Sequence, residues 1–312
     1  MRALACPGSL KGVLTAPDAA AALAEGLRAG GADAVELPVA DGGEGTADVL
    51  RRALGGSWLG AVVTDAFGAP RDVEWLLLPD GTAVVEAAAA IPLDPSRLDP
   101  LAATSRGFGE LVLAALAARP RALVVCLGGT ATVDAGEGMR EVLDALPVPT
   151  RALCDVRTTL WDAPRVFGPQ KGASPADVAV LERRLRLQHD LVPHADVPGA
   201  GAAGGLGAAL AALGAELLPG APWVLEAIGL RGRLHAATLA VTGEGRVDAT
   251  TSAGKAPAAV ADAAREVGVR CVVFGGVVAE PLPGVETRAL SGDPGRAAAD
   301  LYELGRALAE RG

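Results

Sequence analysis

The 312-residue sequence contains no asparagine, one tyrosine and only three lysines, against 25 arginines. It also lacks any apolar run near the ~20 residues that a transmembrane helix needs, so we expect no membrane span. The 28 basic side chains are outnumbered by 37 acidic ones, for a formal net charge of −9. Because no basic stripe is present to meet a phosphate backbone, nucleic acid is not an expected partner.

Cysteine and histidine are too sparse to build a metal or disulfide framework. The four cysteines, Cys6, Cys126, Cys154 and Cys271, are scattered and form no CxxC pair. The three histidines share no ligand spacing. We therefore expect free thiols in a reducing cytoplasm.

Short β-rich runs alternate with alanine- and leucine-rich stretches of helical periodicity. The strand-like run Arg2–Cys6 precedes a helix over Ala16–Ala29, and Leu239–Thr242 precedes a helix over Ala256–Val267. This alternation predicts βαβ units and an α/β fold with a doubly wound, mostly parallel, Rossmann-like sheet. We assign to this domain residues 1–58, 92–147 and 236–312.

Two stretches break the alternation and predict a second domain. Residues 61–86 contain three β-rich runs separated by turn signals such as Pro79-Asp80-Gly81, which is typical of hairpins. Residues 147–230 are rich in glycine and proline and contain few parallel-strand candidates. We assign residues 59–91 and 148–235 to a mixed α/β domain inserted into the first.

Glycine-rich loops follow five of the predicted strands, at residues 7–12, 40–46, 128–136, 243–248 and 275–276. Ligands of an open parallel sheet bind beyond the carboxyl ends of its strands, and we expect all five loops at one sheet edge. Glycines let backbone N–H groups approach an anion, and a following helix N-terminus adds partial positive charge. The loops therefore predict a phosphate-binding site.

The charged side chains in these loops suit phosphoryl transfer. Lys11 and Lys255 can neutralise phosphoryl oxygens. Four carboxylates could bind Mg²⁺, and one of them could act as a base for a hydroxyl group: Asp41, Glu44, Asp134 and Asp248. No GxxxxGK[ST] motif is present, and the GxGxxG at residues 199–204 follows no convincing strand, so it is a weak dinucleotide signal.

The three lysines share one sequence feature, because each adjoins a glycine. They occur in Leu10-Lys11-Gly12, Gln170-Lys171-Gly172 and Gly254-Lys255-Ala256. An ammonium group is a compact point charge that suits phosphate, whereas guanidinium is a wide planar fork. In a chain that otherwise uses arginine, our hypothesis is that these lysines persist because they contact phosphate.

Several blocks of the sequence resemble the bacterial type-one glycerate kinases, in the order that this family has them. Residues 6–16, CPGSLKGVLTA, resemble the family's opening APDSFKGSLSA, and residues 40–46, ADGGEGT, are identical to its next block. Residues 127–138 resemble GGSATNDGGAG. Further matches lie at residues 167–173, 198–207, 242–248 and 254–257, and all three lysines fall inside matched blocks.

The resemblance implies a small-molecule kinase that transfers the γ-phosphoryl group of ATP to D-glycerate with Mg²⁺. It also implies an active site in a cleft between a Rossmann-like domain and a second α/β domain. Lys11, Asp41 and Asp248 are the predicted catalytic residues, with Asp41 and Asp248 as metal ligands. The predicted substrate-binding residues are Ser9, Gly42, Gly43, Glu44 and Lys171. The predicted nucleotide- and phosphate-binding residues are Gly128, Gly129, Thr130, Asp134, Gly243, Glu244 and Lys255.

The sequence departs from the family pattern at positions near the predicted site. Gly8 replaces the aspartate of the opening motif, and Val133 replaces an asparagine. These changes keep two alternatives open. One is a non-catalytic sensor that retains the nucleotide or acid pocket, and the other is a kinase with a changed acceptor.

Overall fold

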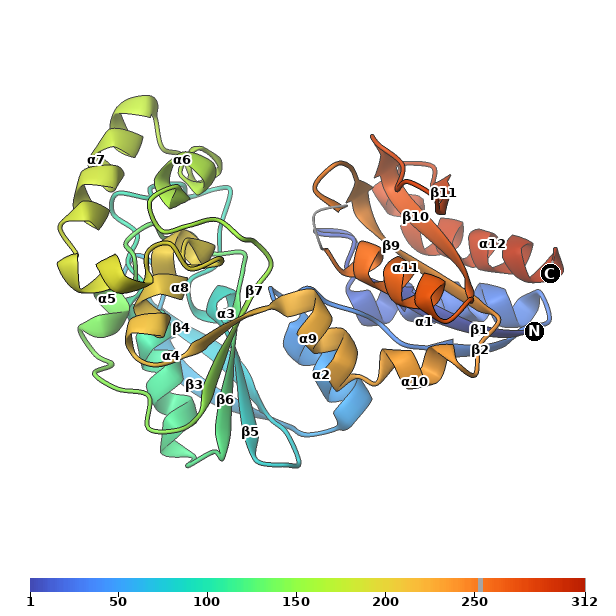
Figure 1. Cartoon of the computed structure of the whole chain (residues 1–312), viewed down its shortest axis with the longest axis horizontal. Coiled ribbons are helices and arrows are strands. Elements are labelled where there is room, and N and C mark those ends of the chain that lie inside the picture. The colour runs from blue at the N-terminus through green and yellow to red at the C-terminus, as the bar shows by residue number, and fades with distance from the viewer. Residues whose placement is uncertain (252–254, 312) are drawn as a thin grey trace. The chain divides into compact units, whose positions relative to one another are not determined.

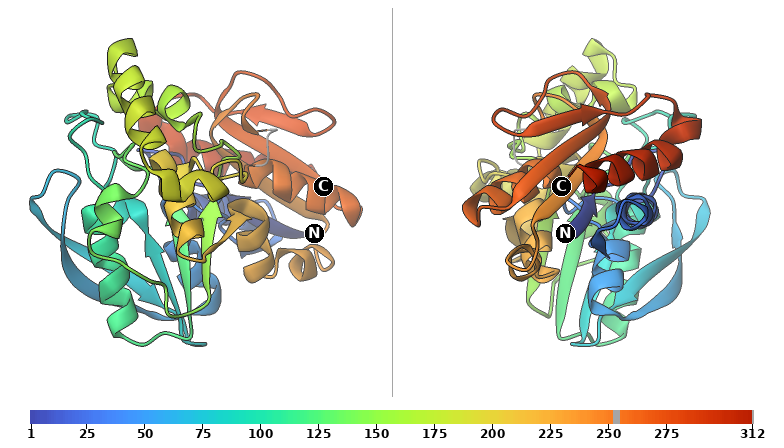
Figure 2. Two further views of the ribbon diagram at one scale, coloured as in Figure 1. Left: turned by 60° about the vertical axis from the view of Figure 1, so that its left-hand side comes forward. Right: turned by 90° about the vertical axis from the view of Figure 1, so that its right-hand side faces the viewer.

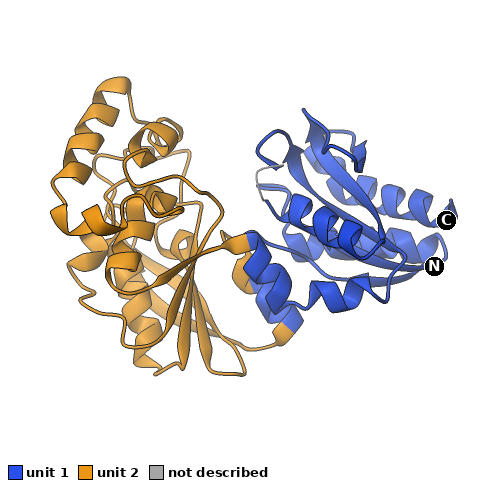
Figure 3. Cartoon of the chain, in the orientation of Figure 1, with its two compact units in different colours: residues 1–41, 48–53, 221–312 blue, residues 42–47, 54–220 orange. Residues whose placement is uncertain are grey.

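The computed structural model describes residues 1–251 and 255–311. The chain divides into two compact units, shown in different colours in Figure 3. Unit 1 comprises residues 1–41, 48–53 and 221–312, and unit 2 comprises residues 42–47 and 54–220. The long middle part of the chain thus forms a unit inserted into the one built mainly from its two ends.

Unit 1 is built on a five-stranded sheet in which every strand is parallel to its neighbours. The strand order is β11-β10-β9-β1-β2 (Figure 1). The strands are β1 (Arg2–Pro7), β2 (Asp33–Glu36), β9 (Leu239–Val247), β10 (Arg270–Val278) and β11 (Glu286–Ala289). This confirms the predicted parallel sheet.

Helices cover both faces of this sheet. Val272 and Phe274 of β10 belong to a core shared with α1 (Ala16–Ala29) and α12 (Ala297–Glu310). Val273 belongs instead to a core shared with α11 (Ala256–Glu266). Because alternate residues of a strand point to opposite faces, α1 and α12 lie on one face and α11 on the other. Figure 2 shows α12 beside α1.

Unit 1 also includes two shorter helices, α9 (Gly220–Ala227) and α10 (Leu230–Leu234). Helix α2 (Thr46–Leu54) is divided between the two units. Helix α1 begins where its sequence predicts, because the Thr15 side chain accepts a hydrogen bond from the Asp18 N–H.

Unit 2 contains a six-stranded mixed sheet in the order β3-β4-β5-β6-β7-β8. The first pairs are antiparallel and those from β5 onward are parallel. The strands are β3 (Ser57–Thr64), β4 (Pro70–Leu77), β5 (Thr82–Glu86), β6 (Ala122–Leu127), β7 (Thr150–Cys154) and β8 (Glu216–Pro219). The predicted hairpins are confirmed; Asp65, for example, accepts hydrogen bonds from the N–H groups of Phe67 and Ala69 in the β3–β4 turn.

Five helices of unit 2 contribute to one core cluster with this sheet, in which Phe108 and Leu111 belong to the same cluster as Leu123 and Val125. They are α3 (Ala87–Ala90), α4 (Arg106–Ala117), α5 (Glu137–Arg140), α7 (Pro175–Arg186) and α8 (Ala202–Ala212). Unit 2 also contains α6 (Ala163–Phe167). Among the described residues, no helix is long and apolar enough to cross a membrane.

The domain boundaries drawn from the sequence require correction. Residues 92–147 were assigned to the first domain, but they belong to unit 2, because β6 pairs with β5 and β7. Residues 221–235 belong to unit 1, and residues 42–47 and 54–58 belong to unit 2. A buried parallel strand has the same apolar sequence in either sheet, so its local pattern does not reveal which sheet it joins.

The glycine run at residues 199–207 is a packing feature. A Cβ atom on Gly201 would lie 2.3 Å from the Thr159 carbonyl oxygen, and one on Gly204 would lie 2.0 Å from that of Thr132. These glycines allow backbone segments inside unit 2 to meet at a distance that any side chain would prevent. Close packing thus accounts for glycine at these positions of the GxGxxG without a bound dinucleotide.

Candidate active site

The loop after β1 positions Ser9 and Lys11 at the carboxyl end of the parallel sheet. The N–H of Gly8 donates to the carbonyl of Gly243 at 2.8 Å, which extends the β1–β9 pairing by one residue. Leu10 and Leu14 then close the loop through reciprocal backbone hydrogen bonds of 3.0 Å. Lys11 is exposed, and no carboxylate among the described residues forms an ion pair with it.

Asp41 and Glu244 come to the same sheet end from the two strands beside β1. Beyond β2, the N–H of Val39 donates to the carbonyl of Pro7 at 3.0 Å, and Asp41 lies two residues farther along. Glu244 follows Gly243, which is paired with Pro7. Asp41 is close enough for its charge to help raise the pKa of Glu244. Unit 1 therefore gathers Ser9, Asp41 and Glu244 at one sheet end.

Glu244 is a fixed carboxylate of weakened acidity. Burial is the main cause that raises its pKa above 4.5, and the charge of Asp41 adds to this effect. The Thr251 hydroxyl donates to Glu244 Oε1 at 2.6 Å, and Lys255 Nζ lies 3.6 Å from Oε2. Only 17% of the Glu244 side chain is exposed. A carboxylate held in this way suits general acid–base chemistry better than one free in solvent.

Two residues near Glu244 have local roles that the sequence did not reveal. Strand β9 extends to Val247, so Gly243 and Glu244 lie inside it rather than in a following loop. A Cβ atom on Gly243 would lie 2.2 Å from the Phe274 carbonyl oxygen, so this glycine permits close strand packing. Lys255 occupies the N-cap position of α11. Gly254, in the same sequence block, lies outside the described residues.

Asp248 stabilises its own turn, although the sequence predicted a metal ligand. Its Oδ1 accepts hydrogen bonds from the Thr250 hydroxyl at 2.6 Å and the Thr250 N–H at 2.9 Å. These bonds, the hydroxyl first, lower the pKa of Asp248. Arg246 Nε also lies 3.2 Å from Oδ2. A carboxylate committed to these donors is a poorer candidate for metal binding or proton transfer than Glu244.

The two glycine-rich loops of unit 2 contact each other. A Cβ atom on Gly128 would lie 3.0 Å from the Cα of Gly43, and one on Gly129 would lie 3.4 Å from Glu44 Oε2. The structure therefore brings Gly43 and Glu44 together with Gly128 and Gly129. Because β6 belongs to the six-stranded sheet, the prediction that all five loops share one sheet edge is wrong.

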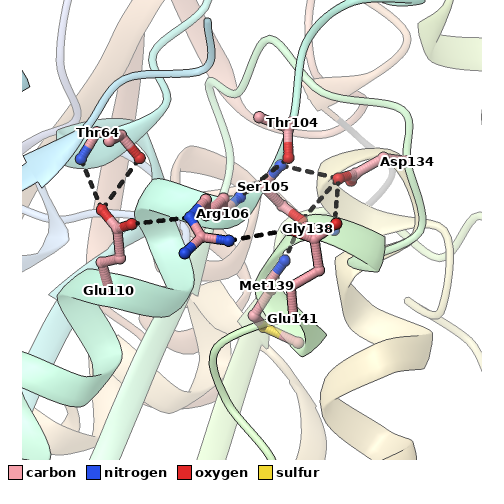
Figure 4. A network of polar contacts seen from close by, with 9 residues as sticks. All are labelled: Thr64, Thr104, Ser105, Arg106, Glu110, Asp134, Gly138, Met139 and Glu141. Carbon is pink, nitrogen blue, oxygen red and sulfur yellow. Dashed lines mark hydrogen bonds and ion pairs between the residues drawn. The ribbon is translucent and has the colours of Figure 1, made fainter. Parts of the chain in front are cut away.

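Asp134 is a buried carboxylate with several hydrogen-bond donors, and its contact with nucleotide stays a prediction. Only 3% of the residue is exposed. Its Oδ2 accepts hydrogen bonds from the Ser105 N–H at 2.8 Å, the Ser105 hydroxyl at 2.7 Å and the Gly138 N–H at 3.2 Å, as Figure 4 shows. Its Oδ1 accepts from the Gly136 N–H at 3.2 Å. These donors join the start of α4 to α5.

Lys171 is also buried, with 3% of the residue exposed, so the structure does not support its predicted contact with substrate. Its Nζ donates to the Thr132 carbonyl oxygen at 2.7 Å and lies 3.4 Å from the Thr130 hydroxyl. Burial lowers the pKa of Lys171 to about 7, although the charges of Asp134 and Asp155 act in the opposite direction. The lysine is therefore in contact with the segment after β6, which contains Thr130 and Thr132.

Two polar residues at the strand ends of unit 2 were missed by the sequence analysis. Glu86 ends β5, and its carboxylate accepts hydrogen bonds from the N–H groups of Gly45 and Ala47. Asp155 follows β7, and its Oδ2 would lie 3.9 Å from a Cβ on Gly128. Each lies at the carboxyl end of a parallel strand, which is where ligands of such sheets bind. The sequence analysis could have used this position only if it had first recognised the second sheet.

No group of three or more potential metal-ligating side chains occurs within residues 1–251 and 255–311. A closed zinc-type or calcium-type cage is therefore absent from this part of the chain. Mg²⁺ has a different requirement, because proteins commonly hold it through one or two carboxylates together with substrate phosphates. Asp41 and Glu244 fit that requirement.

The sheet-end residues of unit 1 fall in the sequence blocks that resemble glycerate kinases, and a comparison with known families tests that resemblance. The model described as the glycerate kinase family matches residues 3–149 and 145–292. The chain belongs to the glycerate kinase family. This confirms the resemblance seen in the sequence and the prediction of a kinase.

Similar proteins come from several bacteria. The glycerate 2-kinase of Escherichia coli K12 is 38% identical over 85% of this chain and 82% of its own length. The glycerate kinase of Bacillus subtilis 168 is 37% identical over 89% of this chain and 85% of its own length. A crystal structure from Salmonella typhimurium LT2, provisionally described as glycerate kinase 2, has a TM-score of 0.83 and 31% identity. That match covers 100% of this chain and 98% of the other.

Gly8 departs from the glycerate kinase pattern, but the backbone here would accommodate the family's aspartate without a steric clash. A Cβ atom there would lie 3.4 Å from the Gly243 carbonyl oxygen and 4.0 Å from that of Val39, which are ordinary contacts. The residue after Gly243 is Glu244, and Asp41 follows Val39 by two positions. An aspartate at position 8 would therefore extend from between the two strands that carry this carboxylate pair.

Lys171→Met tests the buried ammonium through the pH dependence of stability. Folding lowers the pKa of Lys171 from 10.5 to about 7, so between these values the unfolded chain binds more protons than the folded protein. Burial of this lysine should therefore lower the free energy of unfolding by its full amount below about pH 7. This loss of stability should disappear as the pH rises toward 10.5. The full change should be on the order of a few kcal/mol.

Denaturant unfolding at about pH 7 and about pH 9.5 provides the measurement. Over this interval the wild type should gain stability relative to Lys171→Met, because methionine cannot titrate. If the difference in free energy of unfolding between the two proteins does not change with pH, the pKa of Lys171 is not lowered by folding.

Proposed function

We propose that this protein catalyses the ATP-dependent phosphorylation of D-glycerate, or of a closely related small hydroxy acid, to give its phosphate ester. The observation that carries the proposal is the sheet end of unit 1. There the Ser9–Lys11 loop lies beside β9, and Asp41 is close enough to Glu244 for its charge to help raise the pKa of that glutamate. Phosphoryl transfer depends mainly on positioning and charge neutralisation, and these groups supply both.

Lys11 is proposed to neutralise charge on the transferring phosphoryl group. Its ammonium is exposed and is not engaged by a carboxylate of the described chain. Ser9 precedes it by two residues and would donate a hydrogen bond to the acceptor carboxylate or to the phosphoryl group. A loop closed by Leu10 and Leu14 holds both residues without the entropy cost of ordering a flexible segment.

Glu244 is proposed as the base that accepts the proton of the acceptor hydroxyl. Burial and the charge of Asp41 raise the pKa of Glu244, which makes it a stronger base than an ordinary glutamate carboxylate. Asp41 would then bind Mg²⁺, which supplies positive charge to the nucleotide phosphates.

The unit 2 loops supply candidates for acceptor and phosphate binding. The carboxylate of Glu44 is exposed on a backbone packed against Gly128, so it can accept hydrogen bonds from hydroxyl groups. Gly42 and Gly43, with Gly128 and Gly129, would contribute backbone N–H donors, and Thr130 a hydroxyl. The free cysteines of the chain are compatible with a cytoplasmic site of action.

Two other functions remain open because of Gly8 and Val133. A sensor would bind nucleotide or acid without turnover, and a kinase with a changed acceptor would use another hydroxy acid. The structure favours catalysis over a sensor in one respect, because the carboxylate pair of Asp41 and Glu244 is retained beside position 8.

A coupled assay of ADP release separates the three functions. The purified protein with ATP and Mg²⁺ should release ADP only when D-glycerate is present. Turnover with another member of a panel of small hydroxy acids would identify a changed acceptor. Tight calorimetric binding of ATP analogues and glycerate without any turnover would establish the sensor and refute the proposed activity.

Replacing Lys11 tests its role in the transition state. Lys11→Ala should lower kcat by roughly 10²–10³, the usual effect of removing one preorganised donor from a developing oxyanion. Lys11→Arg should restore only part of this, because a planar fork does not reproduce a compact ammonium. The melting temperatures of both variants should match that of the wild type, because Lys11 is exposed. If Lys11→Arg behaves as the wild type, Lys11 is a bystander.

Glu244→Gln and Asp248→Asn form a matched pair that distinguishes the proposed base from a turn carboxylate. Glu244→Gln should lower kcat by about 10²–10⁴, the range expected when a general base is removed. The wild-type rate should fall as the pH drops through the raised pKa of Glu244, because the base becomes protonated. This acid limb should be absent from Glu244→Gln and retained in Asp248→Asn. A larger loss in Asp248→Asn than in Glu244→Gln would reverse the assignment.

A further inference from the structure

Glu86 makes an unusual contact for a residue at the end of a strand. It is the last residue of β5 and occupies the N-cap position of α3, yet its side chain makes no capping hydrogen bond to that helix. Instead, Oε1 accepts from the N–H of Ala47 at 2.7 Å and Oε2 accepts from the N–H of Gly45 at 3.2 Å. Both oxygens thus bind the first turn of α2, about 40 residues away in the sequence.

This contact has a clear electrostatic basis. The first N–H groups of a helix have no partner within the helix and carry partial positive charge. A carboxylate that accepts two of them forms charge-assisted hydrogen bonds, which are stronger than neutral ones. Glu86 therefore occupies the start of α2, the helix end at which the glycine-rich sequence predicted a phosphate. Its anion is a side chain of the protein itself.

The same loop is fixed at its other end by close packing. A Cβ atom on Gly42 would lie 2.7 Å from the Cα of Gly220 and 2.8 Å from the Cβ of Leu153. Gly43 in turn packs against Gly128. The backbone of residues 42–47 is therefore held by glycine packing on one side of Glu44 and by Glu86 on the other. Glu44 itself is exposed between these two points.

We propose that Glu86 is a positioning residue, which holds the loop of residues 42–47 so that Glu44 is correctly placed for the acceptor. Glu86 acts through the backbone of Gly45 and Ala47 and does not touch the substrate. This inference rests on the proposed glycerate kinase activity for its kinetic consequence. Its structural consequence, a loop held by a carboxylate, is independent of that activity.

Glu86→Gln is the informative substitution, because it keeps the size of the side chain. A glutamine has a single amide oxygen, so its NH₂ group would face one of the two backbone N–H donors. Glu86→Asp keeps the charge but shortens the side chain by one methylene group. Glu110→Gln is the matched control, since Glu110 Oε2 likewise accepts a backbone N–H of unit 2, that of Thr64 at 2.7 Å, and lies on α4 (Figure 4).

Hydrogen–deuterium exchange gives the first readout, without any need for turnover. Peptides that cover residues 42–50 should take up deuterium faster in Glu86→Gln than in the wild type. In Glu110→Gln these peptides should exchange at the wild-type rate. Unchanged exchange in Glu86→Gln would overturn the inference, because the loop would then be held without the carboxylate.

Steady-state kinetics give the second readout. A purely structural role of Glu86 would not change the constants for D-glycerate while leaving those for ATP unaltered. In Glu86→Gln, kcat/KM for D-glycerate should fall by about 10- to 100-fold, because misplaced groups lose much of their effect. The KM for ATP should stay within about twofold of the wild-type value, and Glu86→Asp should recover part of the loss. Glu110→Gln should be similar to the wild type in every constant.

The outcomes separate this inference from the proposed function. Faster loop exchange with an unchanged kcat/KM for D-glycerate would show that Glu86 is structural only, and would overturn its positioning role. An equal loss in Glu110→Gln would show a general effect of destabilising unit 2, which also overturns it. If the wild type itself shows no glycerate-dependent turnover, the proposed function fails, and the exchange data still decide whether Glu86 holds the loop.

Discussion

The structure depends on close approach between backbone segments at positions where only glycine fits. A Cβ atom on Gly243 would lie 2.2 Å from the Phe274 carbonyl oxygen, and one on Gly204 would lie 2.0 Å from that of Thr132. A side chain at either position would force strands or loops apart, because real Cβ atoms do not tolerate such distances. The glycines thereby set the spacing at which the neighbouring charged residues are presented. Glu244 follows Gly243 directly, and Glu44 follows the Gly43 that packs on Gly128.

The sequence predicted where individual strands lie along the chain better than it predicted which strands pair with one another. The run Ala122–Leu127 is a strand with the predicted bounds, yet it joins the second sheet. Strand pairing is decided by which apolar faces fit together over long sequence separations, and a local pattern contains no record of that choice. Strand β9 extends beyond its apparent end at Thr242 for a related reason. Pairing with β10 keeps Gly243 to Val247 extended, although glycine and charge in that segment are typical of a loop.

The sequence pointed to candidate site residues, but it did not reveal the hydrogen bonds that distinguish them in the fold. Asp134, Asp248 and Glu244 all appear in the sequence as acidic residues within or beside glycine-rich segments. Their roles differ because of their neighbours. Asp134 is satisfied by buried donors from Ser105, Asp248 by the turn through Thr250, and Glu244 by Thr251 and Lys255. Hydrogen-bond partners outside the motif decide which carboxylate can still act on a ligand, and those partners are known only from the fold.

The three lysines, like the carboxylates, differ in their surroundings although their sequence contexts are similar. Lys11 is exposed at a strand end, Lys255 pairs with Glu244, and Lys171 is buried against the Thr132 carbonyl oxygen. Phosphate contact can explain why lysine is kept at the first two positions, but it does not explain Lys171. A buried site favours lysine for another reason. Its ammonium is compact, and it can lose its proton when burial lowers its pKa, whereas a guanidinium group stays charged and needs more partners. The three lysines therefore have different surroundings, and one physical explanation does not cover all of them.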